Sequence, residues 1–374
     1  MKSKFFISEK TPETLEQGKV SSIDLLSGKV FVYLRNGLIS ASSYLYDLDD
    51  LREGNSVLVG RVSNSYVIIS KVPSLPREGR SFSYGRPIGP RALFGGGWST
   101  NMENTIDYFT ITIKGNATDF GNLTRNRSRL TACSSPVRGL FIGGVGSNQG
   151  NISSEYITFA TKGNASPFTD MSIALVEYSS SCSSPICGIV FGGWAATHAA
   201  MMFYINIATE GERGFFGSLT GWRTASAACS SPTRGVVGGG TQAAIQSIME
   251  FITIATTGNS TLFGDLSIGR GYLAACSYIR GVFGGGQSVI NTIDYIIIST
   301  LGNAADFGDL SVGRDSLAAC SSPTRGVFGG GQSSIIKNTI DYIIISTLGN
   351  AADFGDLSVG RAVLAACSNS HGGL

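Results

Sequence analysis

The chain has 374 residues, and its 28 basic and 26 acidic side chains give a formal net charge of +2. This near balance argues against electrostatic attraction to nucleic acid or to an anionic membrane surface. No apolar run approaches the roughly 18 residues of a membrane-spanning helix, and the opening MKSKFFISEK has no apolar stretch long enough for a secretory signal. Fifty glycines, with abundant Val, Ile, Thr, Tyr and Phe, predict an all-β protein.

Residues 1–72 lack the motifs that recur in the rest of the chain. Short β runs lie at 19–26, 28–34, 38–44, 56–62 and 66–72, and an acidic segment at 46–54 is compatible with a helical turn. This pattern predicts a small barrel of OB or SH3 type. An OB barrel can bind single-stranded nucleic acid, but few basic residues lie beside the aromatics, which favours a docking or spacer role. Residues 73–90 are rich in proline and glycine and predict a linker.

Residues 91–374 consist of six repeats. The segment 291–314, NTIDYIIISTLGNAADFGDLSVGR, returns unchanged at 338–361. Every unit contains a glycine-rich segment, an aromatic residue, a phenylalanine and a cysteine. The glycine-rich segments begin at Arg91, Arg138, Cys187, Arg234, Arg280 and Arg325. The aromatics are Tyr108, Tyr156, Tyr204, Phe251, Tyr295 and Tyr342, and the phenylalanines are Phe120, Phe168, Phe216, Phe263, Phe307 and Phe354. The cysteines are Cys133, Cys182, Cys229, Cys276, Cys320 and Cys367.

A period of this length with several β runs per unit is typical of a β-propeller. Each unit provides four strands, which we name a (LAACS), b (RGVFGGG), c (TIDYIIIS) and d (ADFGDLS), so six units predict a six-bladed ring. The small residues of strand a are expected to line the central channel. The phenylalanine of strand d is expected to pack between neighbouring blades with the aromatic of strand c. The first unit has no strand a before it, so residues 364–368 are expected to supply that strand and close the ring.

The repeated cysteines are expected to be free thiols that pack as small residues. No close pair of the CxxC kind is present, and one cysteine per blade at the same strand position forms a ring with members too far apart to bond. Cys182 and Cys187 are the one plausible disulfide pair, since they flank a short turn. However, Cys187 stands where other units have Arg, which favours a simple substitution. Neither a metal nor a cofactor is predicted.

Catalysis finds little support in the sequence, and the chain is not expected to be an enzyme. Its two histidines are His198 and His371, with no Ser/His/Asp order and no HExxH motif. No Walker lysine follows the glycine runs. Four aspartates recur with the repeat, as structural residues do, whereas a catalytic residue would break the symmetry. They are Asp294, Asp309, Asp341 and Asp356, and the second and fourth are expected to make turn or strand-end hydrogen bonds.

Binding is the better use of such a fold. The b–c and d–a loops of an antiparallel blade emerge on the same face, and the b–c loops vary most among the repeats. Variable exposed loops on a rigid ring are where recognition concentrates. The candidate ligand- or partner-binding residues are Trp98, Trp194, His198, Gln242, Gln287 and Gln332 from b–c loops and Arg223, Arg270, Arg314 and Arg361 from d–a loops. For Trp98, Trp194 and His198 the alternative is packing between loops or against a neighbouring subunit.

The repeats resemble those of kelch propellers. Paired glycines, Tyr295 and Tyr342, and then Arg314 and Arg361 follow the kelch pattern, with phenylalanine where kelch units usually have tryptophan. The sequence of the whole repeat unit, together with the ending SNSHGGL at 368–374, resembles repeat proteins of tailed bacteriophages, especially marine cyanophages. This resemblance implies a virion component, assembled in the host cytoplasm, with a docking N-terminal barrel and a displayed propeller.

The expected function is that of a phage virion structural protein, a tail-tip or fibre-associated adhesion, receptor-binding or protein-interaction module. A purely structural particle component, such as a tail nozzle, an adaptor or a capsid decoration, is the alternative, and a carbohydrate-active propeller enzyme is less favoured. The expected partners are other virion proteins through residues 1–72, a host-surface glycan or receptor, and further copies of the chain. Neither nucleic-acid binding nor membrane insertion is expected.

Overall fold

The computed structural model describes residues 14–24, 29–34, 37–43, 56–62 and 65–72 by their strands, and residues 89–146, 153–170, 177–194, 200–210 and 213–370 in full. The chain divides into two compact units, Met1–Tyr84 and Gly85–Leu374. All regular structure among the described residues is β, so they contain no helix and none that could cross a membrane.

The first unit contains five described strands. They are β1 (Thr14–Asp24), β2 (Lys29–Leu34), β3 (Gly37–Ser43), β4 (Ser56–Val62) and β5 (Ser65–Val72). Their order is β1-β2-β3-β5-β4, with β3 and β5 parallel and β1 pairing with β4. Assignment to an OB or SH3 type stays a prediction. The helical turn expected at 46–54 and residues 73–88 of the linker expected at 73–90 lie outside the described residues.

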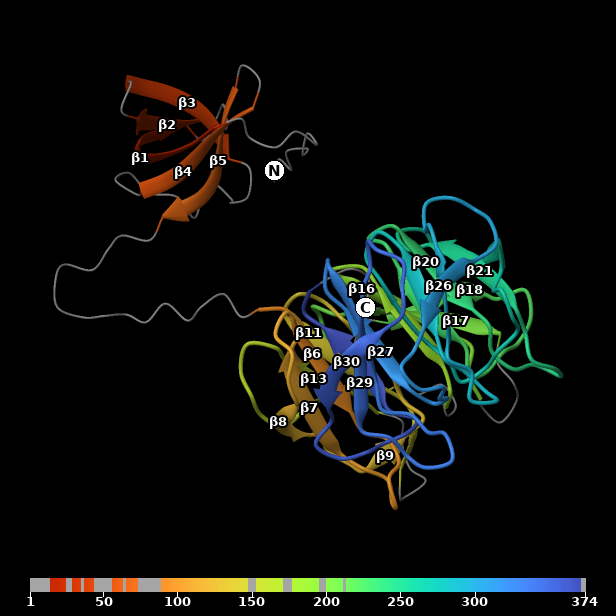
Figure 1. The fold of residues 1–374 in the computed structure, drawn as a ribbon. Coiled ribbons are helices and arrows are strands. Elements are labelled where there is room, and N and C mark those ends of the chain that lie inside the picture. Colours follow the sequence, from red (N-terminus) through yellow and green to blue (C-terminus); the bar gives the residue numbers. More distant parts are fainter. Residues whose placement is uncertain are drawn as a thin grey trace. The chain divides into compact units, whose positions relative to one another are not determined.

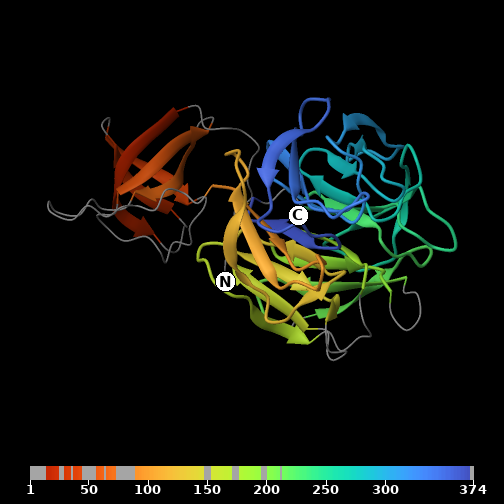
Figure 2. The ribbon, with the colours of Figure 1, turned by 60° about the horizontal axis from the view of Figure 1, so that its bottom comes forward.

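The second unit is a six-bladed β-propeller, which confirms the predicted all-β ring. Six four-stranded antiparallel sheets each have the order a–b–c–d. Strand a of each blade contacts strand a of the next, and the contacts run around a complete circle. The sheets follow one another around a common centre in chain order, from orange through green to blue (Figures 1 and 2).

The strand bounds of the six blades, in the order a, b, c, d, are as follows. Blade 1 has β31 (Ala365–Ser368), β6 (Arg91–Gly95), β7 (Thr105–Thr110) and β8 (Thr118–Asn122). Blade 2 has β10 (Thr131–Ser134), β11 (Arg138–Ile142), β13 (Ser153–Thr158) and β14 (Ser166–Asp170). Blade 3 has β15 (Ser180–Ser183), β16 (Cys187–Phe191), β17 (Met201–Asn206) and β18 (Arg213–Ser218).

Blade 4 has β19 (Ala227–Ser230), β20 (Arg234–Gly238), β21 (Ile248–Thr253) and β22 (Thr261–Asp265). Blade 5 has β23 (Ala274–Ser277), β24 (Gly281–Gly284), β25 (Thr292–Ile296) and β26 (Ala305–Asp309). Blade 6 has β27 (Ala318–Ser321), β28 (Arg325–Gly329), β29 (Thr339–Ile344) and β30 (Ala352–Asp356). A small two-stranded sheet joins β9 (Arg127–Ser128) to β12 (Val145–Gly146).

The ring closes as the sequence predicts. Strand β31 pairs antiparallel with β6, and Ala365 lies opposite Gly95 while Ser368 lies opposite Ala92. The innermost strand of blade 1 therefore comes from the last described segment of the chain, and its other three strands come from the first repeat. This pairing ties together two segments that lie more than 250 residues apart in the sequence.

The inner strands line the central channel and are joined by a ring of serines. In each blade the hydroxyl of the last serine of strand a donates to the main-chain carbonyl of the equivalent serine in the preceding blade, at 2.6–2.9 Å. The six serines are Ser134, Ser183, Ser230, Ser277, Ser321 and Ser368. Every donor and every acceptor in this buried circle is used, so the polar channel wall carries no desolvation penalty there.

The repeated cysteines pack between blades, as predicted. The sulfur of Cys229 faces Gly281 of strand b in the next blade, and a Cβ added to that glycine would lie 2.5 Å from the sulfur. The same close approach joins Cys276 to Gly326. All seven cysteines are free, including Cys187. Glycine is thus required in the RGV motif because the neighbouring thiol fills the space of its side chain.

The phenylalanine of strand d packs between neighbouring blades with the aromatic of strand c, as expected. Phe354 of blade 6 contacts Tyr342 of its own blade edge-to-face, with ring centroids 6.0 Å apart. It also contacts Phe109 of blade 1, with ring centroids 4.8 Å apart, and the three residues belong to one cluster between the two blades. The main-chain N–H of Asp309 donates to Asn350 of the following blade, as a strand-end residue should.

Candidate functional site

The d–a arginines are buried, and this corrects their assignment to the binding face. Arg270, Arg314 and Arg361 are fully buried, and Arg223 is 4% exposed. Each pairs with a carboxylate on strand c of the following blade: Glu250 for Arg223, Asp294 for Arg270, Asp341 for Arg314 and Asp107 for Arg361. Arg127, which was not among the predicted residues, forms the same pair with Glu155. The arginines therefore fasten neighbouring blades together and cannot serve as exposed ligands.

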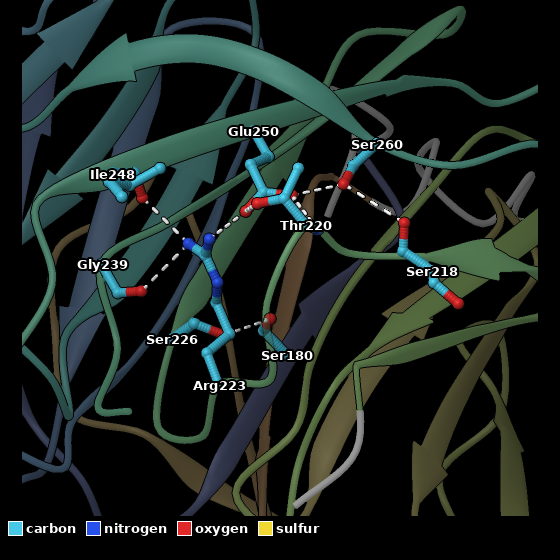
Figure 3. Close-up of polar contacts among 9 residues, drawn as sticks. All are labelled: Ser180, Ser218, Thr220, Arg223, Ser226, Gly239, Ile248, Glu250 and Ser260. Carbon is cyan, nitrogen blue, oxygen red and sulfur yellow. Dashed lines mark hydrogen bonds and ion pairs between the residues drawn. The ribbon is translucent and has the colours of Figure 1, made fainter. Parts of the chain in front are cut away.

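Figure 3 shows one of these arginine–carboxylate pairs. Glu250 accepts hydrogen bonds from the amide and the hydroxyl of Thr220, at 3.0 and 2.8 Å, and also from the hydroxyl of Ser260. Arg223 donates to the carbonyls of Ile248 and Gly239 in addition to the carboxylate. Such buried charges are tolerated because both partners are paired and further hydrogen bonds satisfy them.

In the sequence of blade 3 both members of this pair are replaced. Counted back from Tyr178, Val176 occupies the arginine position but lies outside the described residues, and Phe203 on β17 occupies the carboxylate position. Both residues are apolar. This agrees with physical expectation, since a single buried charge without its partner is strongly destabilising. The recurrent aspartates Asp294 and Asp341 are structural, as predicted.

Each d–a loop contributes one residue, two positions after the arginine position, to the entrance of the channel. The six residues are Arg129, Tyr178, Ala225, Tyr272, Ser316 and Val363, which we call the mouth ring. All six have a positive φ, between 49° and 62°, which is uncommon for residues other than glycine. Each main-chain N–H donates to the carbonyl of the preceding member at 2.8–3.0 Å, and the six hydrogen bonds close into a circle. These bonds hold the left-handed conformation, so the side chain at each position is free to differ.

The first residue of each b–c loop is fixed beside the mouth ring. It pairs with the residue that directly precedes a mouth-ring member. The pairs are Trp98 with Ala362, Val145 with Ser128, Trp194 with Glu177, Thr241 with Thr224, Gln287 with Gly271 and Gln332 with Asp315. Hydrogen bonds thereby fix the main chain of these b–c residues, whereas their side chains differ among the six repeats and only Trp and Gln occur twice.

These residues surround a cavity of about 420 Å³ at the channel mouth. Its lining includes Trp98, Gln287 and Gln332 of the predicted residues. It also includes residues that the sequence analysis did not select, among them Arg129, Tyr178, Tyr272, Asp315 and Ser316. Below it lie two narrower cavities of about 80 and 100 Å³, lined by the mouth ring and by strand a.

The remaining predicted residues lie elsewhere. Trp194 is 48% exposed and pairs through its main chain with Glu177, but it does not line the cavity. Gln242 is one position beyond the b–c residue that pairs with the d–a loop, which is Thr241, and it does not line the cavity either. His198 and His371 lie outside the described residues. No group of three or more His, Cys, Asp or Glu among the fully described residues is placed to hold a metal ion.

A comparison of the two most similar repeats locates the same site. The segments 291–321 and 338–368 agree at every position except two. Asp315 and Ser316 in the first become Ala362 and Val363 in the second, and all four residues line the mouth cavity. These two differences are visible in the sequence, whereas the predicted site residues came from the b–c loops and from the arginines of the d–a loops.

Fold and site together define a closed six-bladed propeller whose varied side chains gather at one channel mouth. The chain matches no protein-family model, and no curated protein matches it.

Proposed function

We propose that this chain is a recognition module that binds its ligand at the channel mouth. The observation that carries the proposal is the difference between the two most similar repeats. Over the segments 291–321 and 338–368 the repeats are identical except at two positions, and the residues at these two positions line the mouth cavity. Side chains that follow the six-fold repeat build the ring, and side chains that depart from it give the mouth its own shape and polarity.

We further propose that the module belongs to a phage virion, as a tail-tip or fibre-associated adhesion protein. Support for this context comes from the resemblance of the repeats to those of tailed-phage proteins. In this setting the residues before the propeller dock to other particle proteins, and the mouth face meets a glycan or receptor on the host surface. The alternative is a purely structural part of the particle, for which the mouth would have no ligand outside the virion.

Binding of the purified full-length protein to cyanobacterial cells tests the proposal. Labelled protein should bind the cells, and D315A/S316V should reduce this binding at least tenfold. The double substitution places in one blade the residues that the neighbouring blade already carries in an otherwise identical frame, so folding should be preserved. Ile186→Ser, on an a–b turn of the opposite face with 67% exposure, is the matched surface control and should bind as the unchanged protein does.

The alternative makes a different prediction. A structural component would not bind host cells, yet it would co-purify with assembled particles in stoichiometric amounts. Absence of cell binding together with stable incorporation into particles would exclude the recognition role. Equal binding by D315A/S316V and by the unchanged protein would place any recognition away from the mouth.

A further inference from the structure

We propose that the mouth cavity binds a neutral sugar ring. This inference rests on the recognition role proposed above and adds the chemical class of the ligand. It follows from four properties of the cavity: its one-sided shape, its aromatic walls, its neutral hydrogen-bonding groups and its compensated charge.

The shape follows from the sizes of the mouth-ring side chains. Tyr178 and Tyr272 meet edge-to-face at 5.4 Å across the small Ala225, so they fill one side of the entrance. On the other side Ser316 and Val363 are small and leave space beneath the b–c loops. The resulting cavity of about 420 Å³ lies in the range of roughly 300–1,000 Å³ that is usual for small-ligand sites. The cavity of about 80 Å³ below the ring has room for only a few water molecules, so a ligand must stop at the ring.

Aromatic side chains provide apolar surface on facing sides of this cavity. Trp98 contributes from blade 1, and it remains 42% exposed because its main chain alone is fixed. Tyr178 and Tyr272 line the cavity from the opposite side of the ring. A sugar ring has a face of C–H groups that packs against aromatic rings and an edge of hydroxyls that does not. Walls of this kind therefore suit a flat ligand with one apolar face.

The polar groups of the cavity match neighbouring hydroxyls. The side-chain oxygen of Gln287 is buried and has no hydrogen-bond partner, so one hydrogen-bond acceptor of the lining is unused. Gln332 adds a second amide, and Asp315 adds a carboxylate that accepts one hydrogen bond from the hydroxyl of Ser316 at 2.8 Å. A sugar hydroxyl both donates and accepts, so adjacent hydroxyls can satisfy amide and carboxylate groups at the same time.

The charge of the lining favours a neutral ligand over an acidic one. Of the described residues that line the cavity, Arg129 is the one cation, and it already pairs with Glu177 at 2.9 Å. Its guanidinium also lies over the ring of Tyr178, 4.9 Å from the centre. Asp315 would repel a carboxylate, a sulfate or a phosphate. An acidic sugar would thus meet one compensated cation and one uncompensated anion.

Saturation-transfer NMR with the full-length protein tests the inference. The probes are the methyl glycosides of glucose, galactose, mannose and N-acetylglucosamine, with glucuronic acid and a sulfated galactose as acidic counterparts and a short peptide mixture as a non-sugar control. At least one neutral glycoside should bind and should bind at least tenfold more tightly than the acidic sugars. Gln287→Leu and D315A/S316V should each weaken its binding at least tenfold, whereas Ile186→Ser should leave it unchanged.

The outcomes separate this inference from the recognition role itself. If cell binding depends on the mouth but no neutral glycoside binds or competes, the sugar assignment is wrong and the recognition role stands. Preferential binding of acidic sugars or of peptides would likewise overturn the assignment. If a neutral glycoside binds at the mouth while cells do not bind, the inference stands and the adhesive role fails. Melting temperatures of the variants within about 2 °C of the unchanged protein show that lost binding does not reflect unfolding.

Discussion

The arginine–carboxylate pair between blades 5 and 6 allows a quantitative test of how the ring is held together. Arg314 donates to Asp341 at 3.0 Å, and both side chains are fully buried. Asp341 also accepts from the amide and the hydroxyl of Ser311, at 3.1 and 2.7 Å. Arg314→Met removes the cation and leaves a buried carboxylate with only the two Ser311 donors. Breaking a buried pair in this way costs about 3–5 kcal/mol.

Asp341→Leu should cost a similar amount, because it leaves a buried guanidinium without its carboxylate. The double variant R314M/D341L should cost less than either single change, about 1–3 kcal/mol, since no charge remains buried and the main loss is the acceptor for Ser311. In the sequence of blade 3, Val176 and Phe203 occupy the two positions of the pair, so the chain itself contains an apolar replacement at both positions.

Thermal melts and urea titrations of the four proteins measure these changes. At roughly 2 °C per kcal/mol for a domain of this size, each single variant should melt roughly 6–10 °C lower, and the double variant should recover part of that loss. A single variant that melts within about 2 °C of the unchanged protein would refute the importance of the buried pair. A double variant whose loss equals the sum of the single losses would refute the idea that the unpaired charge is the main penalty.

Three further outcomes follow from the architecture. Deleting residues 362–374 removes β31 and should lower both the melting temperature and the resistance to proteolysis; unchanged values would contradict closure by the β31–β6 pairing. Ser277→Ala removes the hydroxyl that donates to the carbonyl of Ser230 and accepts from its N–H, and it should cost about 1–3 kcal/mol in a urea titration because buried main-chain groups lose their partner. An effect equal to that of Ile186→Ser would show that the serine ring contributes nothing. Burial raises the pKa of Cys276 to about 12, so its thiol stays protonated in the native state while the unfolded thiol ionises above its ordinary pKa of about 8.5. Stability should therefore fall as pH rises from about 8.5 towards 12, by up to about 1.4 kcal/mol per pH unit for this thiol, and Cys276→Ala should flatten the slope by that amount. A slope that the substitution leaves unchanged would exclude this thiol as the cause.

Much of the ring could be predicted from the sequence because its determinants repeat. The glycine-rich turns, the small residues of strand a and the regular spacing of the cysteines each reflect packing that every blade must satisfy. Six copies of one pattern give the number of blades, and the missing strand a of the first unit gives the closure. The serine ring and the contact of Cys229 with Gly281 then explain why those letters recur.

The site was predicted in part. Of the binding residues predicted from the b–c loops, Trp98, Gln287 and Gln332 line the mouth cavity, and their binding role stays a prediction. The prediction that the d–a arginines bind a ligand was wrong, because it assumed that a charged residue in a loop is exposed. The d–a loop crosses over the next blade, and the side chain of Arg314 is buried against Asp341. In blade 4 the residue after the glycine run is Thr241, and its main chain pairs with Thr224 of the d–a loop. Gln242 follows it and therefore does not occupy the position that Gln287 and Gln332 have in their blades.

The blade could be predicted from the sequence alone: its four strands, its packing residues and the way the ring is closed. The strands and packing residues depend on contacts within one repeat or between adjacent repeats, so the period of the sequence contains them, and the missing strand a of the first unit gives the closure. The positions of the arginine side chains and the contacts between non-repeating residues became known from the three-dimensional structure. Tyr178 and Tyr272 belong to different repeats, and their ring centroids lie 5.4 Å apart because the six blades bring every d–a loop to one axis. The sequence shows which residues vary among the repeats, but which of them contact one another depends on the closed ring.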